Sequence, residues 1–162
     1  MDPVSIAGAV FAISRAVATV ITGFNDIQSR YKRADLAIVA VCSESSAVQA
    51  VLSQIADLLT REGDVVISRL QEQQVLASAF DTALTGCMML YTCLEVELTS
   101  LRKVMKRDGR LGWTKKFKAL WKQDSISALQ GQIRGQVLVL NTLLQGLQTC
   151  VCHPSVPQRG AE

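Results

Sequence analysis

The 162-residue sequence is poor in aromatic residues, proline and histidine, and these shortages exclude several classes of protein. Aromatic residues make up 5% of the chain and there are three prolines, so turn and strand patterns are scarce. The single histidine, His153, lies near the C-terminus, which leaves a histidine-dependent triad or metal site without a framework. No glycine-rich phosphate-binding loop is present. The sequence therefore predicts neither an enzyme nor a bound cofactor.

The cysteines favour reduced thiols over a metal centre or a disulfide framework. There are five of them, with no CxxC pair, and their odd number leaves one unpaired in any disulfide scheme. A cytoplasmic protein is therefore expected. Cys150, Cys152 and His153 are crowded at a predicted helix end, where three ligands rarely make a closed tetrahedral site, so no metal is predicted. Asp2 stands where a secretory signal would be basic, which argues against a cleaved export sequence.

Aliphatic residues dominate the rest of the chain. Hydrophobic residues make up 49% of the sequence, a composition typical of one all-helical domain. The periodicity predicts an all-α fold, a helical bundle of four long helices plus one short helix near residues 113–121. The long helices are expected from residue 3 to at least 24, and near 33–61, 65–106 and 125–152, with a stop at 62–64, a turn at 108–112 and antiparallel neighbours. Residues 1–152 form the predicted bundle domain and 153–162 a flexible tail.

Each long helix carries an apolar face expected to pack in the core. In the first helix this face is Ile6, Val10, Ile13, Val17, Val20 and Phe24. In the second it is Leu36, Val39, Val48, Val51, Leu52, Ile55, Leu58 and Leu59, with Ser43, Ser45, Ser46 and Gln49 mostly outside it. In the third it is Phe80, Leu84, Cys87, Tyr91, Leu94, Leu98, Leu101 and Met105, and in the last Ile126, Leu129, Ile133, Val137, Leu140, Leu144 and Leu147.

Residues 4–24 carry a single charge, Arg15, and so have two possible locations. About 20 apolar residues in a helix can cross the hydrocarbon core of a bilayer, and the same length can form a bundle helix. Arg15 at the bilayer centre would cost roughly 2.5–3.5 kcal/mol, so burial in the bundle is expected for the resting fold. A second line of small residues would let another helix approach closely in an assembled state. Its members are Ser5, Ala9, Ala12, Ala16, Thr19 and Gly23.

The segment 102–122 holds nine Lys or Arg residues against one Asp, although the net charge of the chain is only +3. It has three interpretations: a solvated face whose tryptophans cap the core, a surface for anionic lipid, or a nucleic-acid site. Clustered basic residues near an anionic membrane contribute on the order of 1 kcal/mol each, and tryptophan favours the interface. Few groups could stack on or read bases, which disfavours nucleic acid. The candidate lipid-surface patch is Lys115, Lys116, Lys118, Lys122, Trp113 and Trp121.

The chain resembles the fungal HeLo-like family, the N-terminal helical domains of STAND (NLR-type) receptors. Four features carry the resemblance: the opening Met1–Gly8, the apolar helix that follows, the sequence Arg110-Leu111-Gly112-Trp113, and the closing helix Leu129–Leu147. The family includes the type named after an azaphilone pigment cluster protein, and it is related to the HeLo cell-death domain. It is also similar in architecture to the helical bundle of the necroptosis executioner pseudokinase.

The resemblance implies a module that induces regulated cell death of the heterokaryon-incompatibility type. It would rest in the cytoplasm, oligomerise on activation through the other domains of a larger receptor, and move to the plasma membrane. Its first helix would then enter anionic membranes. The residues expected to insert or to join the copies are Ile6, Val10, Phe11, Ile13, Val17, Ala9, Ala12 and Ala16. The alternative is an adaptor that never meets lipid and acts only through helix–helix contacts with a protein partner.

Overall fold

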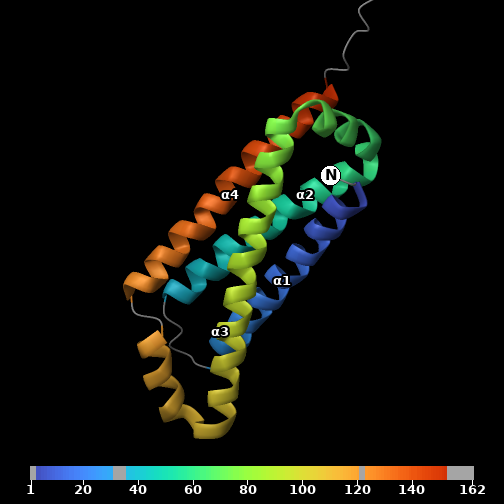
Figure 1. Cartoon of the computed structure of the whole chain (residues 1–162). Coiled ribbons are helices and arrows are strands. Elements are labelled where there is room, and N and C mark those ends of the chain that lie inside the picture. The colour runs from blue at the N-terminus through green and yellow to red at the C-terminus, as the bar shows by residue number, and fades with distance from the viewer. Residues whose placement is uncertain (1–2, 31–35, 121–122, 153–162) are drawn as a thin grey trace, which may run out of the picture.

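The computed structural model describes the backbone of residues 3–30, 36–120 and 123–152, and the side chains of 5–29, 38–103 and 126–149. The described chain forms four helices and contains no strand: α1 (Pro3–Arg30), α2 (Leu36–Glu72), α3 (Gln74–Leu120) and α4 (Gln123–Cys152). Figure 1 shows them gathered into one elongated bundle. The prediction of an all-α helical bundle is therefore confirmed. The predicted flexible tail, 153–162, and the group Cys150–His153 lie outside the described side chains.

The helices pack in the spatial order α1–α2–α4–α3. α1 contacts α2 and α3, and α4 contacts α2 and α3, while α2 and α4 share the most extensive contact. Within the described residues α1 and α4 do not contact each other, so they occupy opposite corners. Helices consecutive in the chain run antiparallel, as predicted, whereas the spatial neighbours α1 and α3 run parallel, as do α2 and α4 (Figure 1).

The core is a layer of aliphatic side chains, with a few aromatic ones, along the middle of the bundle. The predicted lines of α1, α3 and α4 are buried, except that Leu129 and Val137 are only partly so and the side chain of Met105 is not described. The line of α1 also extends one step further than predicted, to Ile27. Burying an aliphatic or aromatic side chain of this size typically stabilises the fold by about 1.5–3 kcal/mol before entropy is subtracted, so these lines hold the bundle together.

The face of α2 was predicted wrongly at two residues, while Leu58 and Leu59 are only partly buried and Leu36 lies outside the described side chains. Val39 is 41% exposed, whereas Ser45 is fully buried. The buried line of α2 is Ile38, Val41, Ser45, Val48, Leu52 and Ile55. Val39 lies nine residues before Val48, which at 100° per residue places the two on opposite sides of the helix. The prediction selected residues because they are apolar, whereas the side of the helix on which a residue lies determines whether it is buried.

The passage from α2 to α3 also differs from the prediction. At the expected stop, Glu62 has non-helical angles, φ −128° and ψ 28°, and α2 kinks there but continues to Glu72. Only Gln73 separates α2 from α3. Its N–H donates to the Arg69 carbonyl at 2.9 Å and its carbonyl accepts from the Ala77 N–H at 3.0 Å. These helix-like bonds leave few backbone groups unpaired, which explains why the chain changes helix within a single residue.

The predicted short helix at 113–121 is not a separate element. α3 extends to Leu120, so the fold has four helices in the described chain and not four plus a short one, although the C-terminal end of α3 bends back in Figure 1. The turn was predicted because of Gly109 and Gly112. A glycine in a helix interior lowers the stability of the helix by only about 1 kcal/mol relative to alanine, so it need not end the helix. The lysines, arginines and leucines around them are good helix formers and outweigh that cost.

Candidate functional site

The inner face of α1 is part of the core. Ile6, Val10, Ile13 and Val17 are each at most 2% exposed. These four residues were expected to enter lipid, and in this structure they face the other helices of the bundle. They can reach a membrane only if α1 leaves its place against α2 and α3.

The outer face of α1 is unusual because it is almost uncharged. Between residues 5 and 25 the exposed positions are Ser5, Gly8, Phe11, Ala12, Arg15, Thr22 and Asn25. Only Arg15 among them is charged, and Phe11 is 62% exposed. The Thr22 hydroxyl donates to the Ala18 carbonyl at 2.8 Å, and that of Thr19 to the Arg15 carbonyl at 3.0 Å. α1 is therefore apolar around nearly its whole circumference, and the hydroxyls of Thr19 and Thr22 are hydrogen-bonded within the helix itself.

The line of small residues on α1 is used in part by the resting bundle. Ala9 and Ala16 are half-buried and pack against the core. Gly23 is buried where α1 meets α3, and a Cβ atom on it would lie 3.0 Å from Cδ1 of Leu98. Ala12, in contrast, is exposed. Near the C-terminal end of α1, Gly23 lets α3 approach closely. Ala12 stays exposed, so it is available for contact with another molecule.

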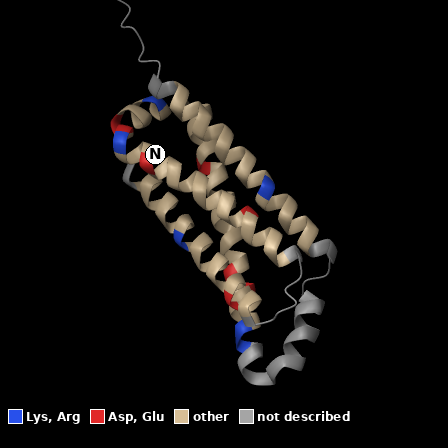
Figure 2. Ribbon diagram, turned by 180° about the vertical axis from the view of Figure 1, so that it is seen from behind, with Lys and Arg blue, Asp and Glu red and all other residues tan. Residues whose placement is uncertain are grey.

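The predicted lipid-surface patch falls outside the described side chains. Trp113, Lys115, Lys116 and Lys118 lie on the described backbone of α3, and Trp121 and Lys122 lie outside it. The lipid-surface role of these residues stays a prediction. Figure 2 shows how sparsely charge is distributed over the described part, particularly on α1 and α4. Between residues 126 and 149, α4 carries one charged residue, Arg134.

A small polar group inside the bundle was not found from the sequence. Ser45 of α2 and Tyr91 of α3 are fully buried, and in the described chain neither hydroxyl has a hydrogen-bond partner. Beside them Glu44 accepts from Nε of Arg134 at 2.6 Å, which ties α2 to α4. The Glu44 side chain is 15% exposed and that of Arg134 70%. The ion pair therefore sits at the edge of the core, with only its cation in water.

Burial raises the pKa of the thiol and of the phenol in this region, Cys87 and Tyr91. Desolvation raises the pKa of the Cys87 thiol from 9.0 to about 12. Desolvation also raises the pKa of Tyr91 well above its usual value, with smaller additions from Cys87 and Glu44, and the Ser45 hydroxyl opposes the shift in part. A thiol and a phenol held in their protonated forms are poor nucleophiles and bases. Their contribution is to packing.

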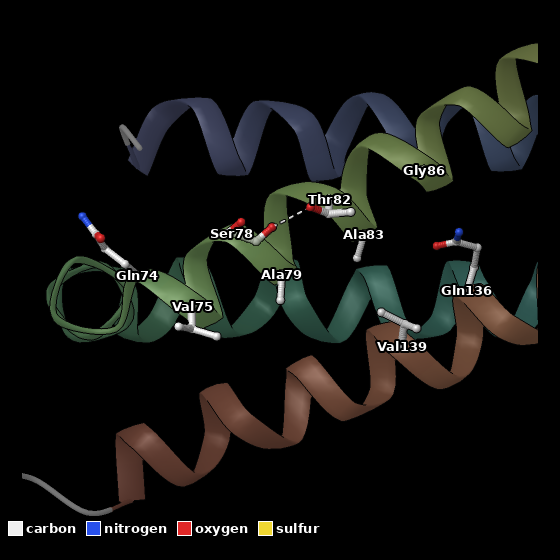
Figure 3. Close-up of a pocket in the computed structure, with 9 residues that line it drawn as sticks. All are labelled: Gln74, Val75, Ser78, Ala79, Thr82, Ala83, Gly86, Gln136 and Val139. Carbon is white, nitrogen blue, oxygen red and sulfur yellow. Dashed lines mark hydrogen bonds between the residues drawn. The ribbon is translucent and has the colours of Figure 1, made fainter.

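A groove of about 780 Å³ runs between α3 and α4 (Figure 3). Its lining includes three small residues of α3, namely Ala79, Ala83 and Gly86. Val75, which is 86% exposed, and Val139 of α4, which is 45% exposed, contribute apolar surface. The remaining lining residues are Gln74, Ser78, Thr82 and Gln136. The residues that line the groove are uncharged, and small and large side chains are mixed among them.

Three segments of the described chain are long and apolar enough to cross a membrane, judged by length and composition alone: Ser5–Ser29, Ile38–Glu72 and Gln74–Lys103. No group of three or more His, Cys, Asp or Glu residues that could hold a metal ion occurs among the residues searched in the described chain.

Comparisons of the chain with family models, with curated proteins and with solved structures give no match. The functional proposal below is therefore based on the surfaces described above.

Proposed function

We propose that this protein is a membrane-active helical bundle that rests in the cytoplasm, oligomerises on activation and then associates with membrane through α1. The observation that carries the proposal is the outer face of α1, which bears one charge between residues 5 and 25 although it is exposed. A helix on the surface of a soluble bundle normally carries charged residues there. A helix that is apolar on both faces suits lipid once its inner face is freed.

The energetics of α1 in a membrane fit this proposal. The helix has 28 residues and is about 42 Å long, which exceeds the roughly 30 Å hydrocarbon core of a bilayer. The hydroxyls of Thr19 and Thr22 already donate to carbonyls of their own helix, so they bring no unpaired donor into lipid. The main cost is Arg15, at roughly 2.5–3.5 kcal/mol for the bilayer centre. Several copies could reduce that cost by turning Arg15 towards a water-filled interior.

The biological setting we propose, regulated cell death triggered through a larger fungal NLR-like receptor, rests on the resemblance of residues 1–8, 110–113 and 129–147 to HeLo-like domains. In that setting other receptor domains bring copies together, and anionic lipids of the plasma membrane are the target. The basic patch of α3 and the residues after it would hold the bundle at the lipid surface.

An adaptor function is the second candidate, and one observation favours it. The α3–α4 groove offers an uncharged, partly apolar surface, which a helix of a protein partner could fill. An adaptor would use this groove and keep α1 in the bundle permanently. The two functions therefore differ in whether α1 meets lipid.

Dye release from anionic vesicles tests the membrane function. The purified chain is expected to release dye in a concentration-dependent manner, and Phe11→Glu is expected to reduce the release at least about fivefold, because a charge on a lipid-facing side chain opposes insertion. Phe11 is 62% exposed, so this substitution leaves the core unchanged.

Leu138→Glu is the matched control, because Leu138 is 69% exposed on α4 and receives the same charge. It is expected to retain dye release. Absence of release by the wild-type chain at any concentration would contradict the membrane function and leave the adaptor. Equal loss in both variants would show that α1 has no special role.

A further inference from the structure

The exposed side of α3 carries a second line of residues with alternating spacings of four and three. Its members are Val75, Ala79, Thr82, Gly86, Met89, Cys93 and Val96, which we call the α3 seam. Gly86 is half-buried and the other six are exposed, with Val75 at 86%, Met89 at 65% and Val96 at 63%. This repeat is the pattern of a coiled-coil seam, and here it faces solvent beside the groove instead of the core.

The order of residue sizes in the α3 seam is nearly the same from either end, with Gly86 at its centre. In an antiparallel pair of identical helices related by a two-fold axis at Gly86, large side chains therefore meet small or similar ones. The pairs that face each other are Val75 and Val96, Ala79 and Cys93, Thr82 and Met89, and Gly86 with itself. A surface that complements its own copy is what a two-fold symmetric dimer requires.

The charge distribution also permits self-pairing. Residues near the two-fold axis face their own copies, so a charge there would meet its like. Residues 82–94 contain no charged side chain, and the only charge of α4 between 126 and 149, Arg134, is paired with Glu44. The positions flanking the α3 seam on its outer side are Ser78, Thr85, Thr92 and Thr99, all uncharged hydroxyl residues. Thr82 donates to the Ser78 carbonyl at 2.8 Å, so its hydroxyl is satisfied within α3.

The available area is sufficient for a specific interface. From 75 to 96 the α3 seam is about 32 Å long, and the surface of two adjacent helices is about 20 Å wide. This gives roughly 640 Å² on each copy, which lies at the lower end of the range for specific protein interfaces. A Cβ atom placed on Gly86 would lie 3.2 Å from Nε2 of Gln136 in the same chain, so the Gln136 side chain covers part of Gly86 and has to rotate aside for a second backbone to approach.

We propose that the occupant of the α3–α4 groove is α3 of a second copy of this chain, in an antiparallel two-fold dimer centred on Gly86. The small residues of the α3 seam favour a packed helix over lipid, which would gain more from large apolar side chains. The dimer supplies the self-association step of the proposed function, on which its biological role rests, but it forms without lipid. Failure of the dimer and failure of the membrane step are therefore distinguishable.

Sedimentation equilibrium of the full chain without lipid or detergent tests the dimer. The wild-type chain is expected to form dimers as its concentration rises from about 1 to 200 µM, the range suited to an interface of this size. Met89→Lys and Thr82→Glu are each expected to weaken the dimer at least about tenfold, because each puts an unpaired charge in the contact. The double variant Thr82→Glu/Met89→Lys is expected to recover most of the affinity, because each Glu then faces a Lys of the other copy.

Leu138→Lys serves as the matched control for Met89→Lys, since the two side chains are 69% and 65% exposed. It is expected to leave the dimer unchanged. The proposal is overturned by a wild-type chain that stays monomeric at 200 µM, by equal weakening in Leu138→Lys, or by a double variant weaker than both single variants, which would indicate a parallel register. A monomeric wild-type chain whose binding to anionic vesicles is lost only in Met89→Lys would assign this face to lipid.

Discussion

Two hydroxyl groups, those of Ser45 and Tyr91, lie in the core where apolar atoms would be expected. In the described chain both lack hydrogen-bond partners, and a buried polar group in that state costs about 1–3 kcal/mol. Cys87 lies on the same buried line of α3, four residues before Tyr91. At this point the buried hydroxyls of α2 and α3 therefore lower the stability of the bundle. Such groups also make the stability of the fold sensitive to pH.

The first prediction at the residue scale concerns alkaline pH. Burial raises the pKa of Cys87 from 9.0 to about 12 and raises that of Tyr91 in the same direction, so the folded state holds protons that the unfolded state releases. The resulting stability is complete below pH 9 and is lost as pH rises from 9 towards 12. The free energy of unfolding should fall by about 1.4 kcal/mol per pH unit above pH 9 for Cys87, and by a similar further amount above pH 10, the ordinary pKa of tyrosine, for Tyr91, as measured by urea unfolding from pH 7 to 10.5.

Substitution of single cysteines identifies the group responsible. Cys87→Ala should lower the stability at pH 7 by leaving a small cavity, and should also reduce the alkaline slope. Cys93→Ala removes an exposed thiol from the same helix and, measured at about 1 µM where the chain is expected to be monomeric, should change neither quantity. An alkaline slope identical in wild type and Cys87→Ala would mean that Cys87 is not the source.

At the scale of the helices, regular spacing was the most informative feature of the sequence. Seven residues of α3, from Phe80 to Leu101, were predicted as a core line and all are buried. The line of α1 was predicted equally well, and that of α4 was predicted except for the half-buried Leu129 and Val137, because alternating spacings of four and three leave little choice of face. The all-α fold class followed from these lines and from the scarcity of turn residues, whereas the additional short helix was predicted wrongly.

Helix boundaries and the α3–α4 groove were beyond the same reasoning. The chain changes direction at Glu62 and again at Gln73, whereas glycine chemistry alone would place one change at Gly63. Gly109 and Gly112, where a turn was predicted, lie inside a helix. Propensities of about 1 kcal/mol cannot decide such cases. The α3 seam was visible in the sequence as a repeat, but its small and polar members did not identify it as a surface. The fold was needed to show that it borders α4.

The prediction at this scale concerns Ala12, on the outer face of α1. Ala12 is exposed, so Ala12→Leu should leave the melting temperature within about 2 °C of wild type. In an assembly of inserted helices the larger side chain would separate neighbouring copies. We therefore expect at least about fivefold slower dye release from anionic vesicles, measured at equal bound protein.

Ala16→Leu provides the contrast, because Ala16 is half-buried and packs against the core. It should destabilise the resting bundle by about 1–3 kcal/mol through overpacking. If Ala12→Leu also unfolds the protein, the small line of α1 serves only the resting core. Undiminished release by a stably folded Ala12→Leu variant would instead remove this line from the assembled state.

For the molecule as a whole, the decisive question is whether α1 can leave while the rest remains. α1 occupies a corner of the bundle and contacts only α2 and α3 among the described residues. The most extensive contact joins α2 to α4, and the pair Glu44–Arg134 reinforces it at 2.6 Å. Departure of α1 would therefore expose one side of the core without separating α2 from α4. It would also remove the most extensive contact of α3, which packs more against α1 than against α4 or α2.

A disulfide between α1 and α3 tests this release. A Cβ atom on Gly23 would lie 3.0 Å from Cδ1 of Leu98, and Leu98→Cys removes the atom that it would meet. The double variant Gly23→Cys/Leu98→Cys places two thiols at this contact between α1 and α3, and their oxidation to a disulfide is verified first by thiol titration. Oxidised, it should be about 2–4 kcal/mol more stable than the same protein reduced, because the bridge closes a long loop. Its dye release should fall at least about tenfold and return when dithiothreitol is added.

The single variant Gly23→Cys, oxidised and reduced in the same way, controls for the five native cysteines. It should release dye equally in both states. Because the comparison within the double variant uses one protein under two redox conditions, a folding defect cannot account for a difference between them. Equal release by its oxidised and reduced forms would mean that α1 stays on α3 while the protein acts on the membrane. The active surface would then have to be one that the resting bundle already exposes, and the α3 seam would be the first to examine.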